Sequence, residues 1–128
     1  PAAIAARTKK AADAKEPMEF VIGYFFDTNY LPFPVEQATV DRAADYAALT
    51  SAKRVDVVGY RGSVVLSNGE LMTEREHLPQ ARARLVADIL HDFGVPEEAL
   101  NVTWVDEPQH AGGVRDFEKR RVVITVVP

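Results

Sequence analysis

One arginine lies where a helical pattern requires an apolar side chain. At about 100° per residue, the segment 78–94 has one apolar face. The residues of that face are Leu78, Leu85, Val86, Ile89, Leu90 and Phe93. Arg82 falls inside the same face, four residues after Leu78. A guanidinium in this position extends to solvent, pairs with an internal acid, or binds an anion. The chemistry open to this chain therefore centres on Arg82.

Two further arginines lie at the start of the last predicted strand. Arg120 and Arg121 are adjacent, so their side chains point to opposite faces of a sheet and only one can face the helices. Arg82 together with that one would make a bidentate site for a carboxylate or a phosphate. The alternative is an internal ion pair. The acidic residues considered for that pair are Asp27, Glu74 and Glu118.

Other chemistry has little support in the sequence. Cysteine is absent, which excludes disulfides, thiolate catalysis and thiolate metal sites. His77, His91 and His110 do not share a helix at a spacing of three or four residues, so we expect no metal site. The chain has no phosphate-binding loop and no nucleophile elbow. We therefore predict a non-enzymatic protein without a cofactor.

The length, charge and hydropathy of the chain limit the classes of partner that it can bind. The 128 residues are enough for one domain with a core. The net charge of -4 disfavours nucleic acid as a general partner, because such binding needs a basic surface. No apolar run reaches the roughly 18 residues of a membrane span. Residues 1–17 are rich in Ala and Lys, and we expect them to form a flexible linker before a single domain at 18–128.

Alternating apolar patterns predict four main strands and two helices. The strands are expected at 19–26, 53–60, 101–105 and 120–127, and the helices at 35–50 and 78–94. The first strand is an almost continuous apolar run, which suggests burial on both faces. The order β-α-β-α-β-β predicts a two-layer α/β (α+β) sandwich. It has a mixed parallel and antiparallel four-stranded sheet, with both helices on one face.

A hairpin is predicted between the second strand and the second helix. Asn68-Gly69 stands between two short apolar runs and accepts the positive φ angles of a tight turn. Apolar residues on such an excursion often mark a partner site. The candidate partner surface consists of Val64, Val65, Leu66, Leu71 and Met72.

Five short motifs follow one another along the chain. They are Tyr24–Asp27, Val57–Tyr60, Leu78–Leu90, Gly94–Pro96 and Arg120–Val122. In this order they resemble the OmpA-like domain of bacterial envelope proteins, a family that includes peptidoglycan-associated lipoproteins and flagellar stator proteins. Each motif is short, and the order and spacing of the set make the resemblance specific.

The resemblance implies a non-covalent peptidoglycan site. In the family, the helix arginine, here Arg82, binds a carboxylate of the stem-peptide diaminopimelate. An aspartate two residues after Gly-Tyr binds the ammonium group, and here that position is Gly62. Three more positions depart from the family pattern, as Arg75, Pro79 and Lys119. The candidate ligand-binding residues are Tyr60, Gly62, Arg75, Leu78, Arg82, Arg120 and Arg121.

These departures make the site more basic and remove the counter-charge of an ammonium group. Losing one partner of a desolvated charge pair costs about 2–5 kcal/mol. The loop between Gly62 and the helix is several residues longer than in the family. Its acidic residues that could replace the aspartate are Glu70, Glu74 and Glu76. We therefore expect an envelope domain in the periplasm, tethered to the outer membrane or part of a larger envelope protein. Its partner is either peptidoglycan, bound in an altered or weakened way, or an envelope protein bound through the hairpin. A small anion in the basic pocket is a third possibility.

Overall fold

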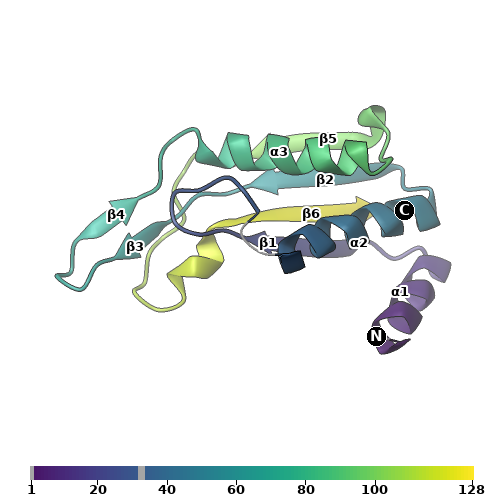
Figure 1. Cartoon of the computed structure of the whole chain (residues 1–128), viewed down its shortest axis with the longest axis horizontal. Coiled ribbons are helices and arrows are strands. Elements are labelled where there is room, and N and C mark those ends of the chain that lie inside the picture. The colour runs from purple at the N-terminus through teal and green to yellow at the C-terminus, as the bar shows by residue number, and fades with distance from the viewer. Residues whose placement is uncertain (1, 32–33) are drawn as a thin grey trace.

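Four strands form a mixed sheet in the order β1-β6-β2-β5. The computed structural model describes residues 2–31 and 34–128 (Figure 1). The strands are β1 (Met18–Gly23), β2 (Arg54–Gly59), β5 (Leu100–Trp104) and β6 (Arg121–Val127). β2 runs parallel to β5, while β6 is antiparallel to both β1 and β2. The β-branched last strand is therefore interior to the sheet, as its composition predicts.

Two helices cover one face of this sheet. They are α2 (Pro34–Thr50) and α3 (Leu78–Asp92), and both lie over the strands in Figure 1. Small residues of α2, among them Ala43, are buried and let the helix approach the sheet closely. Alternate residues of β6, such as Ile124, are buried beneath the helices. The predicted two-layer α/β architecture, β-α-β-α-β-β with both helices on one face, is confirmed.

The first strand differs from its prediction. We expected burial on both faces, but β1 is an edge strand and Val21 is 52% exposed. The apolar run was misleading because the sheet carries helices on one face only. Alternate residues of an edge strand then face solvent, and in β1 only Ile22 is fully buried.

The N-terminal segment expected to be a linker contains helix α1 (Ala2–Asp13) in the structure. Ala11 is buried in the core cluster, and α1 lies against α2. Alanine has the highest helix propensity, which favours a helix in this Ala-rich segment. Tyr46 also donates a hydrogen bond to the carbonyl of Glu16 at 2.6 Å. The domain boundary after residue 17 stays a prediction. The two prolines in residues 27–34 also predict a loop there, of which residues 32 and 33 lie outside the described part.

The predicted hairpin is present and projects from the sheet. β3 (Ser63–Val65) pairs with β4 (Leu71–Thr73) in a separate two-stranded sheet. Gly69 has φ 86° in the turn, which glycine adopts without strain. The hairpin extends away from the end of the molecule that carries α1 (Figure 1). Two short 3₁₀ helices, η1 (Glu97–Ala99) and η2 (Asp116–Lys119), precede β5 and β6.

Candidate functional site

The close approach of α3 to β2 places Arg82. A Cβ atom on Gly59 would lie 2.0 Å from the carbonyl oxygen of Pro79, so only glycine fits under the first turn of the helix. Leu78 is buried next to it, as the apolar face of this helix requires. One turn later, the Arg82 side chain enters the space at the carboxyl end of β2. The short Gly59–Pro79 contact thus sets the depth at which the guanidinium lies.

The guanidinium of Arg82 is fully buried and extensively hydrogen-bonded. Its Nε donates to the carbonyl of Thr28 at 2.8 Å, and its Nη1 donates to the carbonyl of Tyr60 at 2.9 Å. Both Nη atoms also donate to the carboxylate of Glu74, in a bidentate pair with both side chains completely buried. The structure therefore adopts the internal ion pair among the alternatives open to Arg82, and Glu74 is the partner.

The carboxylate of Glu74 has a complete set of donors. Its Oε1 accepts the backbone N–H of Gly62 at 2.9 Å, and its Oε2 accepts that of Asp27 at 2.7 Å. With the two bonds from Arg82, four hydrogen bonds converge on two oxygens. We call these donors, the N–H groups of Asp27 and Gly62 and the guanidinium of Arg82, the Arg82 pocket. It has the groups and geometry that recognise one carboxylate.

Tyr24 forms the floor of the Arg82 pocket. The guanidinium carbon of Arg82 lies 4.6 Å from the centre of the Tyr24 ring, within cation–π distance. Burial raises the pKa of the Tyr24 hydroxyl above its ordinary range, while the charge of Arg82 opposes that rise. Among the described residues, this hydroxyl is the one buried side-chain N or O atom without a hydrogen-bond partner. Tyr24 therefore contributes an aromatic surface to the pocket.

A second layer of contacts closes the pocket from outside. Asp27 and Arg75 form an ion pair at 3.0 Å, and the Asp27 carboxylate also accepts the backbone N–H of Arg75 at 3.0 Å. That backbone hydrogen bond and the guanidinium of Arg75 hold the pKa of Asp27 below its ordinary value. Arg61 donates to the carbonyl of Glu74 at 2.7 Å. Arg75 thus contacts the rim of the pocket, outside the buried pair.

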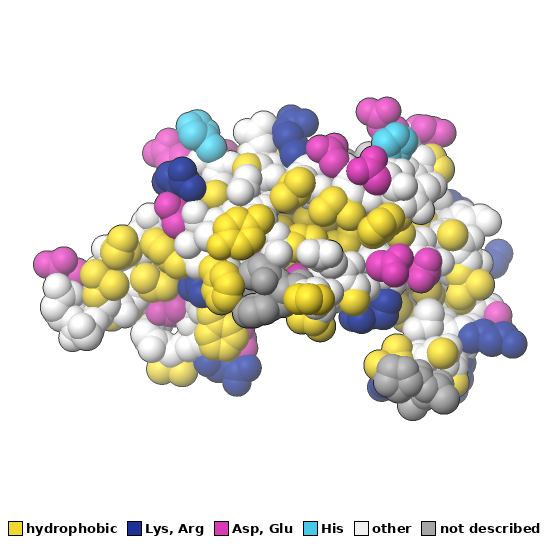
Figure 2. Space-filling model, viewed as in Figure 1, with side chains coloured by type: hydrophobic (Ala, Val, Ile, Leu, Met, Phe, Trp, Pro, Cys, Tyr) yellow, Lys and Arg dark blue, Asp and Glu magenta, His cyan; other side chains and the backbone are white. Residues whose placement is uncertain are grey.

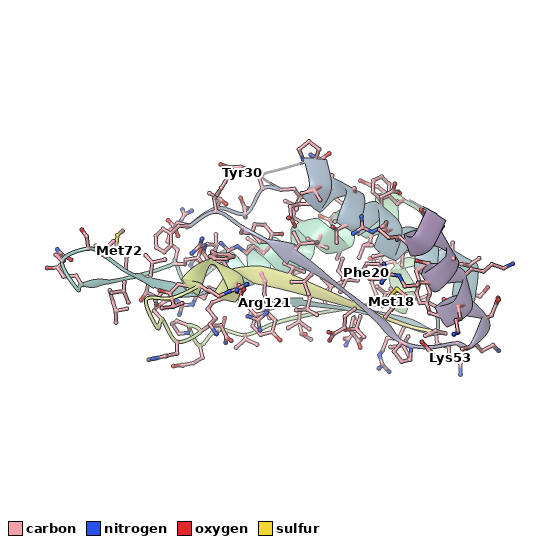
Figure 3. The ribbon with its side chains drawn as sticks, turned by 90° about the horizontal axis from the view of Figure 1, so that it is seen from below. Met18, Phe20, Tyr30, Lys53, Met72 and Arg121 are labelled. Carbon is pink, nitrogen blue, oxygen red and sulfur yellow. The ribbon has the colours of Figure 1, made fainter. Side chains whose placement is uncertain are left out.

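The two arginines before and within β6 lie on opposite faces, as alternation predicts. Arg120 is buried and donates to the carbonyl of Tyr24 at 3.0 Å. Desolvation lowers its pKa, and the nearby charge of Glu74 opposes that shift. Arg121 lies on the other face, with its guanidinium 4.0 Å from the centre of the Tyr60 ring. Arg120 therefore lies beside the Arg82 pocket, whereas Arg121 lies on the opposite face of the sheet. Figure 3 shows Arg121 on the strand, away from the hairpin tip.

Gly62 is enclosed. A Cβ atom at this position would lie 2.9 Å from the Cβ of Lys119 and 3.8 Å from the Cγ of Arg120. The residue also forms an isolated bridge with Gln109. The position at which the resemblance expects an aspartate is thus filled by neighbouring side chains. In its place, the backbone N–H of Gly62 binds Glu74.

The candidate partner surface lies on the hairpin. Leu71 is 62% exposed, and Val65 and Met72 are exposed as well, whereas Val64 and Leu66 are partly buried. Figure 2 shows hydrophobic side chains along this projection, and Figure 3 places Met72 far from Met18 and Phe20. Val65 also lies 3.9 Å from the Cβ position of Gly113. The structure brings these residues together on one projecting hairpin, and the Arg82 pocket lies at the base of that hairpin.

Sequence reasoning missed three contributors to the site. The carbonyl of Thr28 and the backbone N–H of Asp27 are main-chain groups, which carry no signal of their own in a sequence. Tyr24 was part of a recognised motif, and its aromatic character next to Phe25-Phe26 was the available signal. Over the described residues, no group of three or more acidic or histidine side chains is arranged to hold a metal ion. In the same residues, no helix is long and apolar enough to cross a membrane.

Solved structures with the same fold include an OmpA-like domain, a peptidoglycan-associated lipoprotein and a cell wall anchor, all from bacteria. The OmpA-like domain of FopA1 from Francisella tularensis superposes with a TM-score of 0.63 and 18% identity, over 86% of this chain and 71% of that one. The peptidoglycan-associated lipoprotein from Burkholderia pseudomallei gives 0.64 and 18%, over 85% and 90%. The cell wall anchor of the T6SS from Pseudomonas aeruginosa gives 0.58 and 19%, over 95% of each chain. No protein-family model matches the sequence, and no curated protein does. At these identities the likeness establishes the fold.

Proposed function

We propose that this chain, which has the fold of OmpA-like domains, is a non-enzymatic binding module of the bacterial cell envelope. Two of the solved structures with this fold are a peptidoglycan-associated lipoprotein and a cell wall anchor. A periplasmic location, with a tether to the outer membrane or to a larger envelope protein, accords with that comparison. Peptidoglycan is the first candidate partner.

Binding through the Arg82 pocket is altered and weakened in this proposal. The observation that carries it is the bidentate pair between Arg82 and Glu74, both fully buried. The carboxylate of a stem peptide would meet a guanidinium whose hydrogen bonds are already made. Such a ligand must displace Glu74 before it can bind, and displacement reduces its apparent affinity.

The ammonium group of a zwitterionic ligand also lacks a counter-charge at this site. Gly62 offers no carboxylate, and the space beside it is filled by the side chain of Lys119. The pocket rim carries Arg61 and Arg75, both cations. An unpaired charge in such surroundings costs about 2–5 kcal/mol, or roughly two to three decades of affinity. We therefore expect weak retention on peptidoglycan, through the stem-peptide carboxylate alone.

Sedimentation with purified sacculi tests this function. We expect the wild type to be retained weakly, and Arg82→Met to lose that retention while circular dichroism shows a folded protein. Arg84→Ala is the matched control, because Arg84 is an exposed arginine of the same helix, lying over the Trp104 ring. Equal retention of wild type and Arg82→Met, or no retention of either, contradicts peptidoglycan binding through this pocket.

A second candidate function is supported by the hairpin. Its exposed apolar residues, Val65, Leu71 and Met72, lie on a projection that the sheet does not cover. In that case the domain binds an envelope protein and has no need of peptidoglycan. Replacing residues 65–72 by a short Gly-Ser turn should abolish co-purification of that partner from cross-linked envelopes. A strictly monomeric wild type that enriches no envelope protein argues against this function.

A further inference from the structure

Two of the three segments that form the Arg82 pocket lie outside the hairpin that supplies Glu74, and the third, Gly62, directly precedes β3. Asp27 lies after β1, and Arg82 belongs to α3. Glu74 instead follows directly after Thr73, the last residue of β4. The pocket therefore receives its carboxylate from the projecting hairpin, in the way that a receptor site receives a ligand from outside.

The two strands of the hairpin are anchored differently. Before β3, Arg61 accepts a backbone hydrogen bond from Gln109 at 2.9 Å, and its guanidinium donates to the carbonyl of Asp106 at 2.7 Å. β4 pairs with β3, and all three of its residues are exposed. Its attachment to the domain runs through Glu74 and Arg75. The returning strand is therefore held at its base by the Glu74 carboxylate in the pocket and by main-chain bonds. The Glu74 N–H donates to the carbonyl of Gly62 at 3.0 Å, and the Glu74 carbonyl accepts from Arg61 at 2.7 Å.

We propose that Glu74 is an internal ligand of the Arg82 pocket, and that a carboxylate from another molecule binds there when the returning strand of the hairpin carries Glu74 out. The inference rests on the proposed function for its natural ligand and adds the regulation of that site. An incoming carboxylate regains the same four hydrogen bonds that Glu74 gives up. The exchange leaves no donor of the pocket unsatisfied.

Competition with the tethered Glu74 carboxylate lowers the apparent affinity of the pocket for an external carboxylate. A group held on a short flexible linker has an effective concentration in the millimolar range, and an ordered hairpin raises it further. If the open form is populated at about 1%, the apparent affinity for an external carboxylate falls about a hundredfold. The pocket is thus reserved for ligands that are abundant, multivalent, or helped by a second contact.

The same competition links the pocket to the hairpin surface. A partner that binds Val65, Leu71 or Met72 and favours the displaced strand would raise the affinity of the pocket for a carboxylate. By thermodynamic reciprocity, a carboxylate ligand would raise the affinity for that partner by the same factor. The two candidate functions then depend on the same equilibrium, between Glu74 inside the pocket and Glu74 displaced from it.

Small carboxylates test the internal ligand directly. Glu74→Ala empties the pocket, and we expect formate and acetate to raise its melting temperature in a saturable way relative to equal concentrations of chloride. At ten times the dissociation constant of formate, the folding equilibrium should gain about tenfold. Wild type and Glu76→Ala, which keeps Glu74 and changes an exposed acid two residues away, should not respond.

The double variant Glu74→Ala/Arg82→Met identifies the binding group. It should lose the response to formate that Glu74→Ala shows. A folded Glu74→Ala that ignores formate and acetate overturns the proposal. If Glu74→Ala is unfolded in chloride, formate should restore its folded circular dichroism spectrum, and failure to do so also overturns it. No peptidoglycan is present, so this result is independent of the sacculus experiment.

Amide hydrogen exchange tests the link to the hairpin. In Glu74→Ala, the amide of Leu66, which donates to Glu70 across the hairpin, should exchange faster than in the wild type. Adding formate should slow exchange at Asp27 and Gly62, whose N–H groups face the pocket, and leave Leu66 fast. Unchanged exchange at Leu66 in Glu74→Ala would show that the pocket does not hold the hairpin, and would overturn the coupling.

Discussion

Consecutive residues, Glu74 and Arg75, form two ion pairs in opposite surroundings. Glu74 points inward to Arg82, and both side chains are fully buried. Arg75 points outward to Asp27, with side-chain exposures of 70% and 35%. An arginine–carboxylate ion pair therefore occurs once in the buried interior and once at the solvent-exposed surface. The inner pair is costly to break, because one partner remains as an unpaired buried charge. The outer pair is screened.

This difference assigns the two pairs separate roles. The inner pair holds one geometry, since each oxygen of Glu74 accepts two hydrogen bonds and the donors come from three segments. The outer pair adds a contact between the loop after β1 and the residue after Glu74. Breaking each pair in turn should show whether burial, and not the count of hydrogen bonds, decides the loss of stability.

The largest effect is expected for Arg82→Met. It leaves the Glu74 carboxylate buried without a counter-charge, and we expect a loss of about 3–5 kcal/mol of unfolding free energy. Urea unfolding followed by circular dichroism measures it. Glu74→Gln/Arg82→Met should recover part of the loss, because no buried charge remains. A double variant as unstable as the sum of both single variants would contradict this account of the inner pair.

A smaller effect is expected for Gly59→Ala. The new methyl group would lie 2.0 Å from the carbonyl oxygen of Pro79, so the start of α3 must move outward. Overpacking of this kind costs about 1–3 kcal/mol, and it should weaken the inner pair by withdrawing Arg82. Thermal unfolding measures the cost. Gly23→Ala is the matched control, since nothing lies within 4 Å of its Cβ position and the change should be nearly neutral.

The smallest effect is expected for Asp27→Asn. Asparagine tolerates the φ of 60° at this position, so the variant removes mainly the charge. A surface pair of this kind contributes about 0–1 kcal/mol. The pKa of Asp27 is lowered in the folded state, so its contribution is present above the ordinary value of 3.8 and is lost as pH falls through the folded pKa.

Urea unfolding at pH 7 and at lower pH measures this dependence. Wild type and Asp27→Asn should differ at pH 7 and converge once Asp27 is protonated in both states. High salt at pH 7 should also reduce the difference. A difference that persists at low pH would mean that the packing of the side chain, and not its charge, carries the contribution.

The sequence predicted the fold well, because the fold depends on local patterns. Three local patterns each predict their own element: the apolar helical face around Arg82, the Asn68-Gly69 turn, and the β-branched run of the last strand. The edge position of β1 was missed, since an apolar run does not show which neighbours a strand will have. Residues 1–17 were predicted to be a linker, with at most a transient helix, because their Ala- and Lys-rich composition offers few large apolar side chains to bury.

The site was predictable only in part. The place of Arg82 in the apolar stripe identified it, and Glu74 was one of three acids considered as its partner. Choosing among those acids requires the path of the hairpin, which sets where residue 74 returns to the domain. The N–H groups of Asp27 and Gly62 complete the pocket, and main-chain groups are placed by the fold alone. That the candidate ligand-binding residues bind peptidoglycan stays a prediction.

The four hydrogen bonds on Glu74 also bear on the order of folding. They join segments separated in sequence by 47, 12 and 8 residues. Contacts between distant segments form after the chain has closed the intervening loops. Of the four bonds, the one to Asp27 closes a long loop and should form late, so loss of the Glu74 carboxylate should speed unfolding more than it slows folding. Removal of this one side chain should therefore shorten the time that the folded domain persists before it unfolds.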